Sequence, residues 1–167
     1  MKKLPIYFGC ALLAGPMDYQ KRIAIFKKRL SDIPWIKLFE FCVPPPGEKQ
    51  SNLSPSEIYK NDILEGVGGS FVVLGDITYP SLGLGLEIGV AMREHKVRTM
   101  MFAQRLITEN GKKVENVVSK LGIGSPFHNP HASFKWYEES LDELFDEIIY
   151  ELKKAYERFQ FNEILKT

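Results

Sequence analysis

The chain has 167 residues, a length that fits one domain able to bury a core without disulfides or a structural metal. Hydrophobic residues make up 44% of it and charged residues 26%, as in globular proteins, and 22 basic residues nearly balance 21 acidic ones. The basic residues are scattered and no apolar run reaches the roughly 20 residues of a membrane span, so nucleic-acid-binding and membrane-spanning classes are excluded. We therefore expect residues 1–167 to form a single domain.

The first strand is expected at residues 4–9. The start, MKKLPIYFGC, superficially resembles a signal peptide, but Pro5, Tyr7 and Gly9 interrupt its apolar stretch. A short apolar run that ends in glycine is typical of a strand buried on both faces. The two cysteines, Cys10 and Cys42, fit neither a disulfide framework nor a zinc site, which indicates a reducing, cytoplasmic compartment.

A helix, a strand and a second helix follow in the first half of the chain. Residues 18–31 place apolar side chains on one helical face, and residues 35–43 alternate like a strand. Residues 44–52 have the composition of a loop. Ser54, Pro55 and Glu57 then supply a helix cap, a first-turn proline and a capping-box glutamate, so a helix is predicted over 54–65.

The second half continues the alternation of strands and helices. Strands are predicted at 71–75, 97–103 and 133–137, and helices up to about residue 95, over 111–122 and over 138–165. Apolar strands that alternate with helices predict a five-stranded parallel sheet covered on both faces, an α/β three-layer domain of the flavodoxin-like or Rossmann-like kind. Ligands of such sheets bind outside the carboxyl ends of the strands, which directs attention to residues 7–15, 76–85 and 103–110.

A glycine-rich stretch, YPSLGLGLEIGVAM (79–92), carries a carboxylate at Glu87. Its glycine spacing misses the dinucleotide fingerprint GxGxxG by one residue, and no Gly-Lys-Ser/Thr of a P-loop occurs. We expect Glu87 in the first turn of a helix, where the helix dipole favours an ionised carboxylate, with Gly83 and Gly85 clearing space before it. An accessible carboxylate in a cleft suits catalysis at an oxocarbenium-like centre, although acidic residues also occur in first turns for dipole reasons alone.

Three segments together resemble one enzyme family. IYFGCALLAG (6–15), IYKNDILEGV (58–67) and DITYPSLGLGLEIGVAM (76–92) are similar to the nucleoside 2-deoxyribosyltransferases, a family that includes the 2'-deoxynucleoside 5'-phosphate N-hydrolases. The resemblance covers roughly residues 4–122, and the C-terminal third matches only in general layout. It implies cleavage of the N-glycosidic bond through a covalent glycosyl-enzyme, without metal or organic cofactor, in a homo-oligomer whose subunits complete each other's pockets.

The resemblance also implies roles for individual residues. Glu87 matches the nucleophile, Tyr7 the tyrosine that orients it, and Asp62 an acidic residue that assists the leaving base or binds the sugar. Further substrate-binding positions are expected at Gly9, Asp76, Ser81, Gly83, Gly85 and Asn116. Asn116 matches an asparagine that transferases contribute from a neighbouring subunit.

The two branches of the family differ near the 5' end of the substrate. Ser81 stands where transferases carry aspartate and hydrolases serine, which favours a phosphate. Ala11 and Leu13 stand where hydrolases use serine and arginine, and their side chains bind no phosphate. Transfer of 2-deoxyribose to another base is the leading interpretation, hydrolysis of 2'-deoxynucleoside 5'-monophosphates is the alternative, and a non-catalytic nucleotide-binding module is a third.

Each of these residues also has a structural interpretation. Asp62 and Asn116 fit solvated helix surfaces, Tyr7 fits packing at a strand end, and Asp76 and Ser81 fit caps or turns. His128 and His131 flank Asn-Pro with no third ligand nearby, so no metal site is expected. Cys10 fits a small buried residue better than a nucleophile. Met100 and Met101 fit packing in the core.

Overall fold

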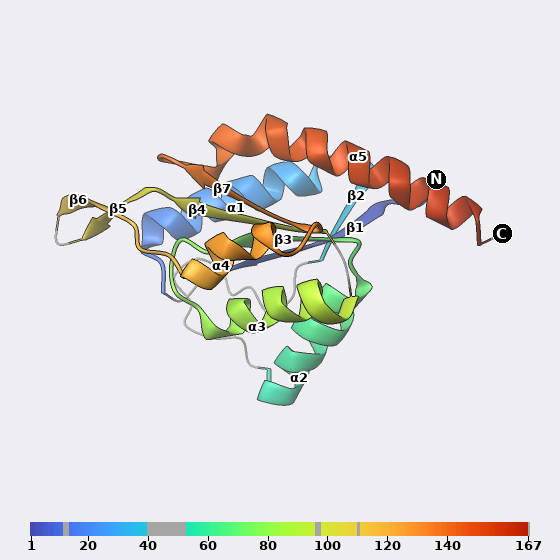
Figure 1. Cartoon of the computed structure of the whole chain (residues 1–167), viewed down its shortest axis with the longest axis horizontal. Helices are drawn as coiled ribbons and strands as arrows, with labels where there is room; N and C mark the ends of the chain where they lie inside the picture. The colour runs from blue at the N-terminus through green and yellow to red at the C-terminus, as the bar shows by residue number, and fades with distance from the viewer. Residues whose placement is uncertain (12–13, 40–52, 96–97, 110, 167) are drawn as a thin grey trace.

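The centre of the molecule is a five-stranded, all-parallel sheet in the order β2-β1-β3-β4-β7 (Figure 1). The computed structural model describes residues 1–11, 14–39, 53–95, 98–109 and 111–166. The strands of the sheet span Leu4–Cys10 (β1), Ile36–Phe39 (β2), Val72–Asp76 (β3), Arg98–Gln104 (β4) and Ala132–Tyr137 (β7). Counted along the chain, these five strands lie in the order 2-1-3-4-5 of flavodoxin-like domains, which confirms the predicted fold class.

Helices cover both faces of this sheet. α1 (Met17–Ser31) and α5 (Phe145–Ile164) lie on one face, and α2 (Pro55–Tyr59) and α3 (Leu82–Val90) lie on the other (Figure 1). A π-helix, η1 (Lys60–Val67), continues α2 directly. The shorter helical segments are η2 (Ala91–His95), α4 (Lys120–Gly124), η3 (Ser125–Phe127) and η4 (Leu141–Leu144). The result is the three-layer arrangement expected from alternating strands and helices.

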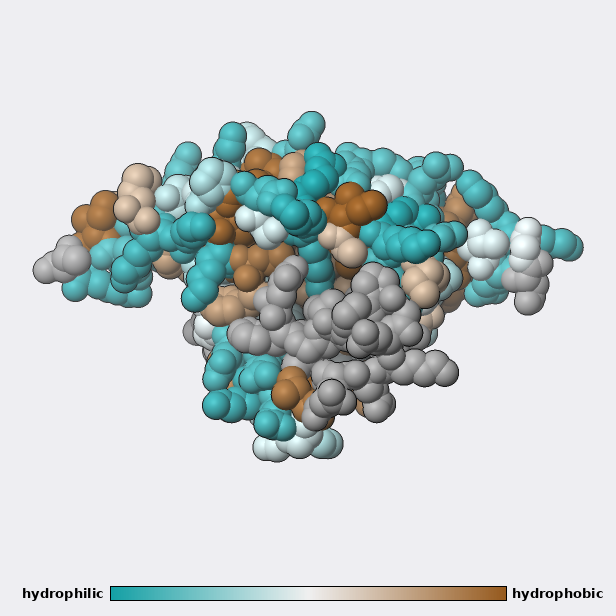
Figure 2. Space-filling model, turned by 180° about the vertical axis from the view of Figure 1, so that it is seen from behind, coloured by the Kyte–Doolittle hydropathy of each residue, from teal (hydrophilic) through white to brown (hydrophobic). Residues whose placement is uncertain are grey.

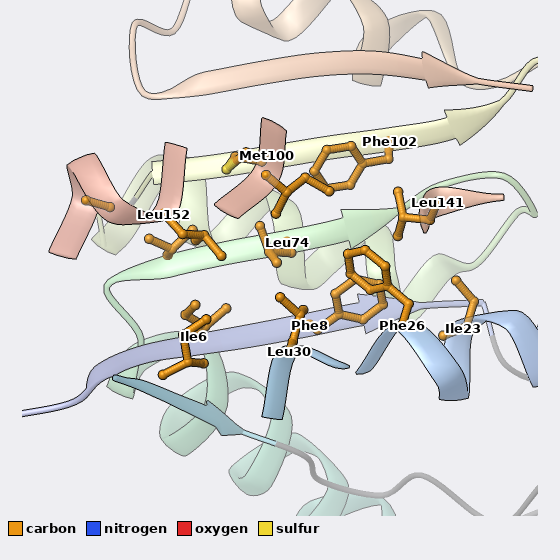
Figure 3. Packing of buried hydrophobic residues seen from close by; sticks show 14 of the residues in the cluster. Ile6, Phe8, Ile23, Phe26, Leu30, Leu74, Met100, Phe102, Leu141 and Leu152 are labelled. Atoms are coloured by element: carbon orange, nitrogen blue, oxygen red, sulfur yellow. The ribbon is translucent and has the colours of Figure 1, made fainter. Parts of the chain in front are cut away.

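The core is divided by the sheet, because successive side chains of a strand point to opposite faces. The larger cluster joins the sheet to α1 and α5, and Figure 3 shows its members, among them Ile6, Phe8, Phe26, Leu74, Met100 and Leu152. On the other face, Tyr7 packs with Val73, and Met101 packs with α3. Met100 and Met101 are therefore both core residues, on opposite faces of β4, as the packing interpretation predicted.

The predicted capping box at Ser54 is confirmed. The Ser54 hydroxyl accepts from the backbone N–H of Glu57, and the Glu57 carboxylate accepts in return from the backbone N–H of Ser54. The helical segment extends beyond the predicted residue 65, and its residues 60–67 are π-helical. The predicted strand at 35–43 is seen as β2 over Ile36–Phe39, and residues 40–43 and the predicted loop at 44–52 lie outside the described residues.

The helix predicted over 111–122 is wrong. β5 (Leu106–Glu109) and β6 (Lys112–Glu115) form an antiparallel hairpin outside the main sheet, with Glu109 paired to Lys112. Gly111 has a φ of 75°, a conformation that glycine adopts without steric cost. The dipeptide Asn110-Gly111 is a strong sequence signal for a two-residue hairpin loop, and it outweighs the weak helical pattern around it. The helical turn α4 begins only at Lys120.

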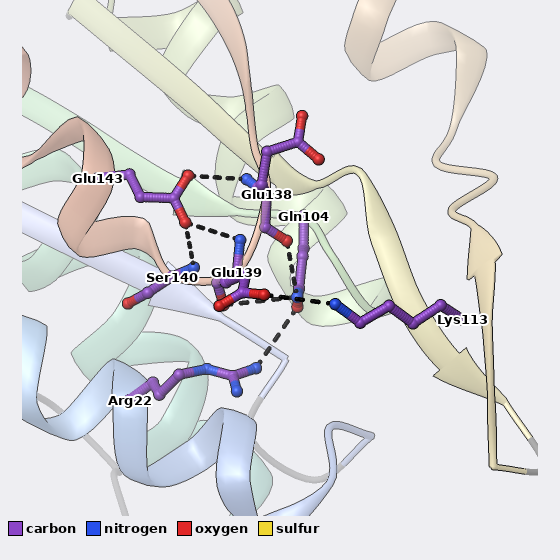
Figure 4. A network of polar contacts seen from close by, with 7 residues as sticks. All are labelled: Arg22, Gln104, Lys113, Glu138, Glu139, Ser140 and Glu143. Atoms are coloured by element: carbon purple, nitrogen blue, oxygen red, sulfur yellow. Dashed lines mark hydrogen bonds and ion pairs between the residues drawn. The ribbon is translucent and has the colours of Figure 1, made fainter.

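The C-terminal helix begins later than the predicted residue 138. The Glu143 carboxylate accepts hydrogen bonds from the backbone N–H groups of Glu138, Glu139 and Ser140, and Figure 4 shows these bonds. The Ser140 hydroxyl accepts from the N–H of Asp142, so Ser140 caps the short helix η4 that leads into α5. Helix formation therefore starts after this cap, because the preceding backbone is held by Glu143 instead.

Hydrophilic side chains cover most of the face turned away from the view of Figure 1, and the hydrophobic surface on that face gathers near its middle (Figure 2). None of the helices described is both long enough and apolar enough to cross a bilayer.

Candidate active site

Three of the predicted site residues meet beside the carboxyl end of β1. Tyr7 comes from β1, Asp62 from η1 and Glu87 from α3, and the charges of both carboxylates act on the Tyr7 phenol. The parallel register brings β1 and β3 together at this end, with Gly9 opposite Gly75, and α3 follows β3 along the chain. The topology therefore gathers side chains that are far apart in the sequence at the edge where ligands of such sheets bind.

Gly9 lets Glu87 approach the strand closely. A Cβ atom at Gly9 would lie 2.5 Å from Oε2 of Glu87, 2.6 Å from Cδ1 of Leu84 and 3.4 Å from Cε1 of Tyr7. Gly66 of η1 plays the same part for the tyrosine, since its Cβ atom would lie 2.8 Å from the Tyr7 ring. A larger residue at Gly9 would displace Glu87, and one at Gly66 would displace Tyr7. The two glycines therefore determine the positions of these side chains.

The Tyr7 phenol lies beside the Glu87 carboxylate, and hydrogen bonding between the two groups lowers the pKa of Glu87. Tyr7 is only 5% exposed, and burial, followed by the charge of Glu87, raises the pKa of its phenol far above the ordinary value. The phenol is therefore neutral at every physiological pH, so it can donate a hydrogen bond toward Glu87 but cannot accept its proton.

The pKa of Glu87 is raised to about 7, mainly by burial and then by the negative charge of Asp62. The hydrogen bond from Tyr7 and the positive charge of Lys27 oppose this rise. The expected placement of Glu87 in the first helical turn is wrong, because α3 begins at Leu82 and Glu87 is its sixth residue. The helix dipole falls off within the first turn, so it does not hold this carboxylate ionised. A carboxylate with a pKa near 7 can serve as either base or acid at neutral pH.

Lys27 of α1 is a buried cation beside the site that was not predicted from the sequence. It is 5% exposed, and its ammonium nitrogen lies 5.3 Å from the centre of the Phe8 ring. Burial raises the pKa of the Cys10 thiol to about 11, and the charge of Lys27 opposes that rise as it does for Glu87. Its position four residues after Ile23, on the buried stripe of the helix, was the available signal.

Asp76 lies in an enclosed polar network rather than in an open pocket. It is fully buried, and burial raises its pKa. The Tyr137 hydroxyl donates to Asp76 at 2.7 Å and the Thr78 backbone N–H at 2.9 Å, while the hydroxyls of Thr78 and Tyr137 are 2.9 Å apart. Asp76 thereby ties the end of β3 to the end of β7.

Ser81, Gly85 and Asn116 line a different space, a cavity of about 810 Å³ between α3, the β5–β6 hairpin and α4. Its remaining walls are mostly apolar, from residues such as Ile88, Met92 and Ile107. Glu87 is not among the lining residues, because a helix turns about 100° per residue and places Gly85 on the side of α3 away from it. Gly85 therefore clears no space beside Glu87, contrary to the expectation from the sequence.

The polar groups in this second space are already engaged within the chain. The Ser81 hydroxyl caps α3 by accepting from the N–H of Leu84 at 3.2 Å, and a Cβ atom at Gly83 would lie 3.9 Å from it. Asn116 is 8% exposed, and its amide donates to the backbone oxygens of Thr78 at 3.0 Å and Gln104 at 2.9 Å. Ser81 and Asn116 thus have clear structural functions of their own.

The predicted site therefore divides into two groups. Tyr7, Gly9, Asp62 and Glu87 are brought together, and Ser81, Gly85 and Asn116 line the cavity on the other side of α3. Ala11 is buried and Leu13 lies outside the described residues. No three histidine, cysteine, aspartate or glutamate side chains of the described segments gather closely enough to hold a metal ion.

The family models and the curated proteins were compared with the chain. No family model matches the chain, and no curated protein matches it significantly.

Proposed function

We propose that this protein cleaves the N-glycosidic bond of deoxynucleosides through Glu87 and transfers the 2-deoxyribosyl group to another base. The observation that carries the proposal is the placement of the Glu87 carboxylate, hydrogen-bonded by Tyr7 and close enough to Asp62 for the second charge to raise its pKa. A second carboxylate beside the nucleophile can stabilise the positive charge that develops on the sugar in the transition state.

In the first step, an oxygen of ionised Glu87 attacks C1' of the sugar while the bond from C1' to the base nitrogen breaks. The electron pair of that bond goes to the base, which takes a proton from water, while ionised Asp62 stabilises the positive charge that develops on the sugar. An ester between Glu87 and the sugar remains. In the second step a nitrogen of an acceptor base attacks C1' and loses its proton to the hydroxide left by the first step, and the ester bond electrons restore the Glu87 carboxylate.

Hydrolysis of 2'-deoxynucleoside 5'-monophosphates is the second candidate, with water in place of the acceptor base. Ser81 supports it, since it lies at the amino-terminal end of α3, where backbone N–H groups favour anions. Buried Ala11 offers a phosphate no side-chain donor, which supports transfer instead. Both reactions share the glycosyl-Glu87 intermediate and differ only in the acceptor.

The proposed enzyme works as a homo-oligomer in the cytoplasm. Leu82 at the start of α3 is 93% exposed, and Val117 at the rim of the 810 Å³ cavity is 92% exposed. Large apolar side chains beside an apolar cavity are typical of a surface that a second subunit covers.

The reaction is tested by incubating the protein with ribo- and deoxyribonucleosides and their 5'-monophosphates, with and without an acceptor base, and separating the products by chromatography. Exchanged nucleoside supports transfer, and free base with free deoxyribose 5-phosphate supports hydrolysis. Failure of every substrate to lose its base contradicts the enzyme proposal, and ligand binding without base release supports the non-catalytic module.

The role of Glu87 is tested separately with Glu87→Ala. Its matched control is Glu65→Ala, which removes an exposed carboxylate of η1 whose surface ion pair with Lys60 contributes little to stability. If the parent protein releases base and Glu87→Ala releases it equally fast, Glu87 is not the nucleophile.

A further inference from the structure

A second cavity lies at the opposite edge of the sheet from Glu87. It has a volume of about 700 Å³ and is bounded by the amino-terminal ends of three strands, where Phe71, Arg98 and His131 stand, and by the last two turns or so of α5. Both termini of the chain also lie at this end of the molecule (Figure 1). The reaction proposed for Glu87 makes no use of this cavity.

Two guanidinium groups line it. One terminal nitrogen of Arg98 donates to Glu151, but Nε of Arg98 is buried and has no hydrogen-bond partner among the described residues. Arg158 makes no hydrogen bond or ion pair with any residue in the described ranges. The Arg98 side chain is 30% exposed, so a ligand in the cavity can reach the exposed part of it.

The local charge favours a negative ligand. Glu151 accepts from both Arg98 and Lys154, and Glu157 is the carboxylate among the lining residues. Arg98, Lys154 and Arg158 thus stand against the two carboxylates Glu151 and Glu157, which leaves one positive charge in excess. Paired guanidinium groups are the usual recognition elements for phosphate.

The remaining wall is aromatic. Phe161 is 62% exposed and lines the cavity together with Phe71, which is held by an edge-on contact to Phe159 with ring centres 5.3 Å apart. An exposed aromatic face beside arginines suits a ligand with a phosphate at one end and a planar base at the other, since planar bases stack favourably on aromatic rings.

We infer that this cavity binds a nucleoside monophosphate, with the phosphate between Arg98 and Arg158 and the base against Phe161. The ligand is an effector rather than a substrate, because the cavity lies across the sheet from the carboxylate pair. The inference is independent of the reaction at Glu87, and either can fail without the other.

Amide ¹⁵N NMR titrations test it, with AMP, adenosine and inorganic phosphate as probes. Gly68, Ser70 and His131 report on this cavity and Gly9 reports on the candidate active site, so the two sites are read separately. AMP is expected to shift the three cavity amides saturably, with phosphate binding more weakly and adenosine far more weakly.

Arg158→Gln is expected to weaken AMP binding at the cavity amides by about tenfold or more, as loss of a charge-assisted hydrogen bond predicts. Lys153→Gln, which removes a positive charge from an exposed position of the same helix outside the cavity, is the control and should leave the affinity unchanged. The inference is overturned if AMP leaves these amides unshifted, if Arg158→Gln binds AMP normally, or if adenosine binds as well as AMP. Phosphate binding as tightly as AMP would overturn the assignment to a nucleotide.

Discussion

The side chains of Tyr7 and Glu87 lie side by side between β1 and α3, next to Gly9, which has no side chain to keep them apart, and hydrogen bonding from the phenol favours the ionised carboxylate. A donor that is neutral at all physiological pH values stabilises the ionised form of its acceptor. Tyr7 therefore counteracts burial and the charge of Asp62, both of which favour protonated Glu87.

Tyr7→Phe is expected to raise the pKa of Glu87 above its present value of about 7, because the hydrogen bond that favours the carboxylate is lost. The rate of base release should fall about tenfold near pH 7 and recover partly at higher pH, the rough size of one charge-assisted hydrogen bond. The pH–rate profile measures the shift. Tyr59→Phe, at a half-exposed position of α2, is the matched control. An unchanged profile in Tyr7→Phe would contradict the role of the hydroxyl.

In the unmodified protein, glycosyl transfer to Glu87 should rise with pH through about 7, because the nucleophile must be ionised. The measurement is a single-turnover rate of base release across pH 5–9. A rate that is flat through this range, in a protein that stays folded, would argue against attack by Glu87.

Glu87→Gln should become increasingly stable relative to the unmodified protein as pH rises. The folded-state pKa is raised above its ordinary value of 4.5, so ionisation of Glu87 costs stability, and the cost grows as pH rises from 4.5 and is complete above about 7. The difference in Tm between variant and parent, followed from pH 4.5 to 8.5, checks this sign. Glu65→Gln, which alters an exposed carboxylate, should show no such trend.

Gly9→Ala is expected to reduce kcat/KM at least about tenfold, because the new methyl group would lie 2.5 Å from Oε2 of Glu87 and displace it. Gly89→Ala in α3 is the contrasting variant, since its Cβ atom meets nothing within 4 Å. It should keep full activity and gain roughly 0.5–1 kcal/mol from helix propensity. Normal kinetics in Gly9→Ala would show that catalysis does not need the close approach of Glu87 to β1.

Tyr137→Phe should lower the free energy of unfolding by about 1–3 kcal/mol, because it removes the 2.7 Å hydrogen bond to buried Asp76. Urea denaturation measures the change, and Tyr150→Phe on the exposed side of α5 should change stability far less. A loss no larger than that of Tyr150→Phe would mean that Asp76 is satisfied without Tyr137.

Leu82→Glu is expected to weaken self-association, since Leu82 is almost fully exposed beside the apolar cavity. Light scattering coupled to size-exclusion chromatography gives the mass of the parent and the variant. Leu165→Glu, at an exposed position near the end of the chain, is the control. A monomeric parent protein would contradict the proposed oligomer directly.

The sheet was predictable because its strands are short apolar runs separated by helical patterns, a signal that is local and repeated. The hairpin at 106–115 was not predicted, because residues 111–122 also fit a helical pattern, which competes with the hairpin-loop signal of Asn110-Gly111. The gathering of Tyr7, Asp62 and Glu87 was predicted from resemblance rather than periodicity. The burial that raises the pKa of Glu87 depends on residues from several elements, so no local pattern encodes it.

The all-parallel sheet also has a consequence for how the chain folds. Each of its pairings joins strands that are distant in sequence, such as Ile6 with Val72 and Thr99 with Ala132. Loop-closure entropy must be overcome before such contacts form, so a high contact order and folding in milliseconds to seconds are expected. No single element carries two of Tyr7, Asp62 and Glu87. A partly folded chain therefore has no carboxylate pair, and catalytic competence should appear together with the native sheet rather than before it.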